Sequence, residues 1–216
     1  GAPVGSLAGS LKTNYPMKLT NPKPLTLRLL PFTRVHITLV GVGGTGSHIA
    51  SGIAAIALDL HERGIRSDIT FIDPDIVEAK NVGRQLFAHG DIGKPKAEVV
   101  AGRLGASYGL AIGASVRWID DADTFLSPNQ DGALNVVVGA VDNPTARAII
   151  AKMVKRAEGK LWWLDCGNEN HSGQVCIGNS VSRIKPALGF VDSLPAPHII
   201  YPDLVKRAIK FDPASR

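Results

Sequence analysis

Cysteine is scarce in this chain: only Cys166 and Cys176 occur among its 216 residues. Two thiols are too few for a disulfide scaffold of the kind that small secreted proteins use. This scarcity favours a reducing compartment, and we expect a cytoplasmic protein.

Other absences exclude further classes of protein. No apolar run is long enough to cross a membrane, and no signal peptide is evident, so we expect no membrane association. The net charge is only +5 and no basic run is present, so we also expect no nucleic-acid groove. The small positive excess suits an anionic ligand, an acidic partner or simply a solvated surface. With 44% hydrophobic residues, the composition predicts an ordinary globular protein with one sizeable core.

The most informative stretch is Val35–Ser47, which reads VHITLVGVGGTGS. An apolar run rich in β-branched residues predicts a short buried strand, and the glycines Gly41, Gly43, Gly44 and Gly46 follow it directly. Helical periodicity then begins at Ile49. A strand, a glycine-rich turn and a helix form the context in which such a motif binds a nucleotide, because phosphate can approach the bare backbone and the free N–H groups of the helix.

Predicted strands and helices alternate along the rest of the chain. This order predicts a doubly wound, mostly parallel, Rossmann-like α/β sheet with helices on both faces. The expected later strands are Asp68–Ile72, Ser115–Ile119, Asn135–Val141, Leu161–Leu164 and Gln174–Ile177, and the expected later helices are Lys94–Ser107, one beginning near Pro144, and Asp203–Lys210. Leu25, Leu27 and Leu29 alternate as in an edge strand. Trp162 and Trp163 are adjacent, so one is expected in the core and the other at a dimer surface.

We divide the chain into three parts. Residues 1–16 have the composition of a disordered leader or an expression remnant, and residues 17–185 carry the predicted sheet. Residues 186–216 form a proline-rich C-terminal extension.

Polar residues follow the predicted strands, at the edge where ligands bind in parallel sheets. Asp73 ends the second strand, about thirty residues after the first glycine, and we expect it to bind the ribose hydroxyls. The alternative is that Asp73, which precedes Pro74, caps a turn. Asp142 and Asn143 follow the apolar Asn135–Val141 run. Asp142 is a candidate Mg²⁺ ligand or, alternatively, a helix N-cap.

The glycine turn lacks the lysine of a P-loop, so any cations for a triphosphate must come from elsewhere. The segment after Asp73 supplies Asn81, Arg84, Gln85, Lys94 and Lys96. Arginine gives a planar fork for phosphate oxygens and lysine gives a point charge. The alternatives are that Arg84 pairs with Asp73 or Asp75 and that the lysines are solvated, which is the interpretation we favour for Lys94.

These motifs, taken in order, resemble the ThiF/MoeB/HesA superfamily, the prokaryotic relatives of ubiquitin-activating enzymes. The resemblance rests on GVGGTGS, Asp73-Pro74-Asp75, Asn81-Val82-Gly83-Arg84-Gln85, the segment Asp91–Glu98, and Val141-Asp142-Asn143 with Arg147. It covers about Val35 to Gly178. The single glycine loop and the tail most resemble the short ThiF-type proteins of PRTRC cassettes.

The resemblance implies a cytoplasmic bacterial enzyme that uses ATP and Mg²⁺ to adenylate the C-terminal glycine carboxylate of a small ubiquitin-like protein. By position, Arg84, Lys96 and Asp142 would be the catalytic residues, with Asp142 on the metal. The implied nucleotide-binding set is Gly41, Gly43, Gly44, Gly46, Asp73, Asp75, Asn81, Gln85 and Asn143. The segment Gly167–Gly173 would lie near the incoming glycine tail. The resemblance also implies a homodimer in which an arginine from the second subunit, Arg28 or Arg34 here, completes the site.

The sequence departs from the family pattern in three ways. Paired Cys-x-x-Cys motifs are absent, so we expect no zinc. Val82 and Gly83 replace bulkier residues without removing a charge. No clear thioester cysteine is present: Cys166 stands after a strand at the expected active edge, but packing explains it better than nucleophilic catalysis, because no His or Lys neighbour would lower its pKa.

Two other functions share the glycine loop. A nicotinamide- or flavin-dependent oxidoreductase would use it, but would leave Arg84, Lys96 and Asp142 unexplained. A non-catalytic partner subunit of an activating enzyme would bind nucleotide alone, and the retained arginine and lysine count against that reading.

Overall fold

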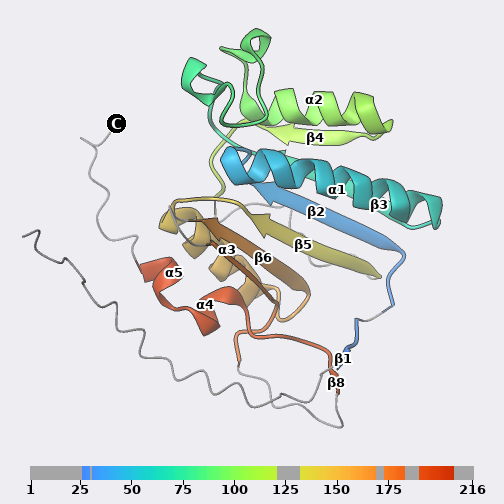
Figure 1. The fold of residues 1–216 in the computed structure, drawn as a ribbon. Helices are drawn as coiled ribbons and strands as arrows, with labels where there is room; N and C mark the ends of the chain where they lie inside the picture. The colour runs from blue at the N-terminus through green and yellow to red at the C-terminus, as the bar shows by residue number, and fades with distance from the viewer. Residues whose placement is uncertain (1–25, 30, 121–131, 169–172, 183–189, 207–216) are drawn as a thin grey trace, which may run out of the picture.

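The protein forms a six-stranded sheet with helices on both faces, seen here in a computed structural model that describes residues 26–29, 31–120, 132–168, 173–182 and 190–206 (Figure 1). The strand order is β4-β3-β2-β5-β6-β7. Five strands run parallel: β2 (Arg34–Val40), β3 (Arg66–Ile72), β4 (Ile112–Ser115), β5 (Ala133–Gly139) and β6 (Leu161–Asn168); β7 (Gly173–Gly178) is antiparallel to β6. The predicted doubly wound, mostly parallel architecture is confirmed.

Each face of the sheet carries its own apolar core. One core packs beneath α1 (Gly44–Glu62) and α2 (Lys96–Tyr108) and includes Leu39 and Phe71, both fully buried. The other lies under α3 (Pro144–Arg156) and includes Val137 and Trp163, also fully buried. Alternate residues of β5 therefore point into different cores, because successive side chains of a strand face opposite sides.

The glycine loop lies at the point where the chain changes direction across the sheet. From β2 the chain proceeds outward through β3 and β4, and it then returns to β5 on the other side of β2. The carboxyl ends of β2 and β5 therefore diverge into helices on opposite faces. This switch point is the usual ligand crevice of an open parallel sheet.

Three expectations need correction. The fourth strand is Ile112–Ser115 rather than Ser115–Ile119, so that Val116 and Trp118 are exposed beyond its end. Both Trp162 and Trp163 are buried, at 6% and 0% exposure, so Trp162 provides no dimer surface; β6 lies inside the sheet rather than at its edge. Gly167 and Asn168 belong to β6 and Gly173 begins β7, so the expectation of a loop is wrong at these positions; residues 169–172 lie outside the described part.

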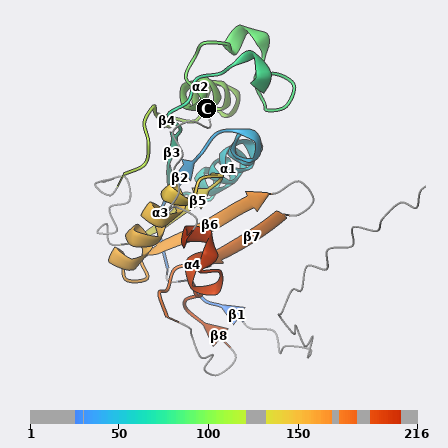
Figure 2. The same ribbon diagram turned by 90° about the vertical axis from the view of Figure 1, so that its left-hand side faces the viewer.

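The described part of the C-terminal extension packs onto the sheet domain. β8 (Phe190–Val191) pairs in parallel with β1 (Thr26–Leu27), within the patch that predicted an edge strand (Figure 2). The short helices α4 (Pro197–Ile200) and α5 (Asp203–Lys206) follow. His198 of α4 stacks on Trp163, with ring centroids 5.8 Å apart. Residues 207–210 of the expected last helix, and the leader 1–16, lie outside the described residues.

Candidate functional site

The four glycines of the loop form two pairs, and the reason why a glycine stands at each position differs between the pairs. Gly41 has φ +88°, and a Cβ there would lie 2.6 Å from the carbonyl oxygen of Ala140. A Cβ on Gly46 would lie 1.9 Å from the Gly41 oxygen. The fold itself therefore requires these two glycines. By contrast, among the described residues a Cβ on Gly44 would meet nothing within 4 Å, and one on Gly43 would meet only the Gln85 side chain, at 3.9 Å.

The open space above Gly43 and Gly44 faces the first turn of α1. The helix has Gly43 as its N-cap, with no side-chain hydrogen bond to the cap and no acidic residue in the first turn. Glycine has no side chain, so this N-cap residue does not itself supply the acceptor that Ser, Thr, Asp or Asn provides at many helix starts. A 19-residue helix beginning in bare glycine is well suited to hold an anion.

Asp73 ties the glycine loop to the end of β3. Its Oδ2 accepts the N–H of Val42 at 2.6 Å, and its Oδ1 accepts the N–H of Asp75 at 2.9 Å. Burial raises the pKa of the Asp73 carboxyl, while the two N–H groups and the Lys96 charge act in the opposite direction. Asp73 thus does cap a turn. Because a carboxylate can accept about four hydrogen bonds, this leaves room for the ribose contact that we expect.

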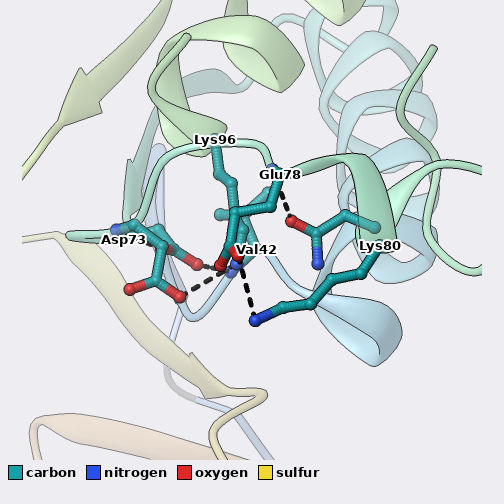
Figure 3. A network of polar contacts seen from close by, with 7 residues as sticks. Val42, Asp73, Glu78, Lys80 and Lys96 are labelled. Carbon is teal, nitrogen blue, oxygen red and sulfur yellow. Dashed lines mark hydrogen bonds and ion pairs between the residues drawn. The ribbon is translucent and has the colours of Figure 1, made fainter. Parts of the chain in front are cut away.

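Lys96, the first residue of α2, lies in the same polar network as Asp73 (Figure 3). Its Nζ is 2.9 Å from Oδ2 of Asp75, and its side chain is only 8% exposed whereas that of Asp75 is 57% exposed. The Lys96 backbone is fixed as well, because its N–H donates to the Asp75 carbonyl at 2.9 Å. The structure therefore brings a buried cation close to Asp73, which in turn contacts the glycine loop.

The segment carrying Arg84 and Gln85 lies over the glycine loop because Leu86 is held on both sides. The Leu86 N–H donates to Oγ of Ser47 at 3.3 Å, and its carbonyl accepts from Nη1 of Arg103 at 2.6 Å. Oε1 of Gln85 is buried without a hydrogen-bond partner among the described residues. Arg84 is exposed, and no ion pair or hydrogen bond of its side chain is recorded within the described part of the chain. Lys94 is exposed too.

Asn81 shapes this segment from within. It is 5% exposed and ends a short 3₁₀ turn, η1 (Ala79–Asn81), where its Oδ1 accepts the N–H of Glu78 at 2.8 Å. A second turn, η2 (His89–Asp91), leads on towards α2. A direct phosphate contact from Asn81 remains a prediction.

Asp142 and Asn143 take separate roles at the start of α3. Asn143 is the N-cap, and its Oδ1 accepts the Ala146 N–H at 2.9 Å. The cap expected of Asp142 is therefore supplied by its neighbour. Asp142 is exposed, with no recorded partner among the described residues, and follows β5 at the switch point. Its carboxylate is available to a ligand in the crevice.

Asp165 and Cys166 lie within β6 rather than after a strand as expected, because β6 extends to Asn168. Burial raises the pKa of the Cys166 thiol, and the neighbouring Asp165 raises it further, which argues against a nucleophilic thiolate. Asp165 is fully buried, and its Oδ1 accepts from Nε of Arg147 at 3.0 Å. Burial raises the pKa of Asp165, while the Arg147 charge lowers it.

Sequence reasoning assigned no role to Ser47, Arg103 or Asp165. Ser47 follows the glycine motif directly, so its position was a usable signal. Arg103 and Asp165 carry no local signal, because their partners Leu86 and Arg147 are 17 and 18 residues away. Arg34, one candidate arginine for a second subunit, begins β2 with its Nε 3.5 Å from Asp68.

Two features are absent from the described residues. None of their helices has the length and apolarity that a bilayer crossing needs. They contain no cluster of three or more His, Cys, Asp or Glu side chains of the kind that holds a metal unaided.

The sequence of this chain is similar to those of several known proteins. The chain is 33% identical to the tRNA threonylcarbamoyladenosine dehydratase of Haemophilus influenzae over 57% of this chain and 44% of the relative. It is 39% identical to human ubiquitin-like modifier-activating enzyme 7 over 32% of this chain and 6% of the relative. Thus the chain spans less than half the length of these curated relatives.

Solved structures of similar proteins include the E. coli dehydratase TcdA in complex with ATP, at 26% identity and a TM-score of 0.46, covering 58% of this chain and 49% of that one. E. coli MccB with ATP gives 24% identity and a TM-score of 0.47, covering 62% and 38%. The model of the ThiF family matches residues 28–191, which is most of the chain. This match confirms the resemblance drawn from the ordered motifs: the chain belongs to the ThiF family.

Proposed function

We propose that this protein uses ATP to adenylate a carboxylate, and that the natural acceptor is the C-terminal glycine of a small ubiquitin-like protein. The observation that carries the proposal is the pair Gly43 and Gly44. Among the described residues, none packs closely against a Cβ at either position, and both glycines border a helix start whose N-cap residue has no side chain. Open space at the positive end of a helix is suited to a phosphate chain.

Two residues of the segment that follows β3 would supply the cations that a triphosphate needs. Lys96 is held by Asp75, which is half exposed and can yield the lysine to a phosphate oxygen. Arg84 comes from the segment that Ser47 and Arg103 fix above the loop. Gln85 supplies no cation: its buried amide oxygen, which has no recorded partner among the described residues, is a hydrogen-bond acceptor and would take a hydroxyl or N–H group rather than a phosphate. Known structures of E. coli TcdA and MccB contain ATP, which is consistent with this assignment.

The chemistry falls mainly to positioning. One oxygen of the acceptor carboxylate attacks the α-phosphorus, a new C–O–P bond forms, and the bond to the β-phosphate oxygen breaks, so that its electron pair leaves with pyrophosphate. Arg84 and Lys96 would neutralise the charge that moves onto the leaving phosphates. No proton needs to be removed from the nucleophile, so the site requires no general base.

Asp142 fits a magnesium ion. A single exposed carboxylate is a common protein contribution to Mg²⁺, which otherwise takes phosphate oxygens and water. When bound, the ion would screen the phosphate charges and orient the oxygens. The absence of a multi-residue acidic cluster among the described residues is compatible with this mode of binding.

The first test is binding. We expect isothermal titration calorimetry to show ATP binding that requires MgCl₂, and no binding of NAD⁺ or NADH. Lys96→Ala and Arg84→Ala should each weaken ATP binding by about tenfold or more, because a hydrogen bond to a charged group contributes about 1.5–3 kcal/mol. Arg63→Ala is the matched control: Arg63 is an exposed arginine at the far end of α1, paired with Asp59. Binding of NAD⁺ in preference to ATP would refute the proposal.

The second test is turnover. Pyrophosphate–ATP exchange should depend on the acceptor, and a panel of small ubiquitin-like proteins ending in glycine should include one that supports it. Because two relatives are named for a modified tRNA nucleoside, tRNA carrying threonylcarbamoyladenosine belongs in the same panel. Exchange with that tRNA alone would refute the protein acceptor while preserving adenylation. ATP binding without exchange for any acceptor would favour a non-catalytic subunit.

A further inference from the structure

One buried ion pair of the sheet domain has no part in the chemistry proposed above. Nε of Arg147, from α3, donates to Oδ1 of Asp165 in β6 at 3.0 Å. The arginine side chain is 11% exposed and the aspartate side chain is fully buried. A Cβ built on Gly167 would lie 3.1 Å from Nη2 of Arg147, so the guanidinium packs directly against this bare stretch of backbone. Both partners are therefore held tightly in place.

Stability alone does not account for this pair. The free energy lost when two charges leave water can exceed the attraction between them, and apolar residues of similar volume are often equally or more stabilising in such a place. In addition, Oδ2 of Asp165 is buried and has no hydrogen-bond partner among the described residues, which is itself unfavourable. The pair is better explained by what it holds in place than by the stability that it adds.

The pair joins the two ends of the connection that carries Asp142. Gly139, the last residue of β5, lies beside Asp165 in the parallel register. Arg147 stands near the start of α3, and residues 140–143 connect the two elements. The contact between Arg147 and Asp165 therefore ties the helix start directly to the sheet, across the short connection in which Asp142 lies.

The absence of a side chain at Gly139 brings α3 close to the sheet. A Cβ there would lie 3.3 Å from Cδ1 of Ile150 in α3 and 3.4 Å from Oδ1 of Asp165. Distances this short are at or below the usual limit for a Cβ, so helix and strand pack together with no side chain from this position between them. The start of α3 thus has little freedom to shift relative to β5 and β6.

The same connection contacts the glycine loop. The Ala140 N–H donates to the Val40 carbonyl at 2.9 Å, and a Cβ on Gly41 would lie 2.6 Å from the Ala140 oxygen. Asp142 follows two residues later and is exposed, and its side chain has no recorded partner in the described part of the chain. The backbone of the connection therefore sets the position of this carboxylate, since no recorded hydrogen bond of its own does so.

We propose that Arg147 and Asp165 are positioning residues, which hold the start of α3 so that the Asp142 carboxylate lies where it can serve the phosphates of bound ATP. The inference rests on the proposed function, in which Asp142 is a magnesium ligand. Mg²⁺ demands near-ideal octahedral geometry, so a single carboxylate serves it only from a closely defined position. Residues that orient a metal ligand typically contribute roughly ten- to a hundredfold to metal affinity.

The decisive variant replaces the whole pair by apolar residues, Arg147→Met together with Asp165→Leu. Because no buried charge is left without its partner, this variant should fold and should melt at the Tm of the parent or above it. Isothermal titration calorimetry then measures two ligands, ATP with MgCl₂ and AMP in EDTA. We expect the affinity for ATP with MgCl₂ to fall about tenfold and the affinity for AMP, measured without metal, to stay unchanged. A pair that only supports the fold would leave both affinities unchanged in a variant of parental stability.

Asp142→Ala connects the pair with the carboxylate that it positions. Alone, this substitution should weaken binding of ATP with MgCl₂ about tenfold or more and leave AMP binding unchanged. Added to the apolar pair variant, it should cause little further loss, because changes that act through one group are not additive. The matched control is Arg63→Met with Asp59→Leu, the same replacement at an exposed ion pair of α1, which should alter neither affinity.

The outcomes separate this inference from the proposed function. If Asp142→Ala weakens ATP binding while the apolar pair variant binds ATP like the parent, the positioning role is refuted and the magnesium ligand stands. Full additivity of the two changes also refutes the positioning role. If Asp142→Ala has no effect, or the parent does not bind ATP, the proposed function fails at that point and this inference fails with it.

A second pair variant covers the case in which the apolar pair does not fold. Arg147→Gln with Asp165→Asn removes both charges and keeps polar side chains of similar shape. It should weaken binding of ATP with MgCl₂ several-fold and leave AMP binding unchanged, because a neutral hydrogen bond is roughly half as strong as a charged one. Parental affinity for ATP in this variant would refute the positioning role as well.

Discussion

Gly44 and Gly46 differ by two positions in the chain, yet substitution of each by alanine should have opposite consequences. In the part of the chain that the structure describes, a Cβ at Gly44 meets nothing within 4 Å, and Gly44 does not have a positive φ. Alanine there should be tolerated, and within a helix it is worth up to about 1 kcal/mol over glycine. For a protein of this size, that gain raises Tm by roughly 2–4 °C.

Gly46→Ala should fail for a steric reason. The new Cβ would lie 1.9 Å from the carbonyl oxygen of Gly41, which is backbone and cannot rotate away. Forced overpacking costs about 1–3 kcal/mol and sometimes more. We expect a loss at or beyond the upper end of that range, which lowers Tm by roughly 6–12 °C.

Ligand binding should follow a different order from stability. Gly44→Ala places a methyl group in the space where we propose that a phosphate binds, so ATP affinity should fall between about tenfold and a hundredfold, as for one lost charged hydrogen bond. Differential scanning calorimetry gives Tm and isothermal titration gives Kd for both variants. Parent-like ATP binding by Gly44→Ala would refute the reasoning, because the open space would then have no connection with nucleotide. A large fall in its Tm would refute the packing argument.

Three other predictions follow. Ser47→Ala removes the hydroxyl that accepts the Leu86 N–H. In pyrophosphate exchange, this variant should raise the KM for ATP several-fold with little change in the KM for the carboxylate substrate. An equal change in both KM values would contradict a role of Ser47 in fixing Arg84. Cys166→Ala should retain exchange activity, and a loss of exchange in this variant would instead indicate a nucleophile. Because burial raises the pKa of the Cys166 thiol, its alkylation by iodoacetamide should be slow at neutral pH. As the pH rises, the thiol of the unfolded chain should ionise before that of the folded protein, so any stability that the neutral thiol contributes is lost in alkaline solution. Burial lowers the pKa of His198 from 6.5, so its contribution to stability is complete above that pH and is lost as the pH falls through the lowered value. His198→Phe keeps an aromatic ring against Trp163 and should flatten the decline of Tm between about pH 7 and 5. An unchanged profile of Tm against pH would assign that decline to other groups.

The local pattern of the chain was sufficient to predict the sheet and the glycine turn. β-branched runs followed by polar or small residues specify buried parallel strands, and the order of elements then permits few topologies. The boundaries were less certain: β4 was predicted several residues late, because Ile112–Ser115 is short and carries little apolar character, while the neighbouring Val116–Ile119 stretch is more apolar but stays outside the sheet. The two tryptophans were misjudged for a related reason, since alternation shows which faces a strand presents but not whether both faces are covered.

In the candidate site, too, the sequence predicted some features and only the tertiary structure decided the others. The sequence by itself made Gly41–Gly46, Asp73, Lys96 and Asp142 candidates: the glycines, Asp73 and Asp142 follow predicted strands, and Lys96 is a cation in the segment after Asp73. Only the tertiary structure distinguished the glycines required by packing from those facing open space, and only it paired Lys96 with Asp75 and Arg147 with Asp165. Those pairings join residues 21 and 18 positions apart, and the chain must fold before their charges meet. Local propensity acts over a few residues, whereas a binding site depends on which distant strand ends share one edge of the sheet.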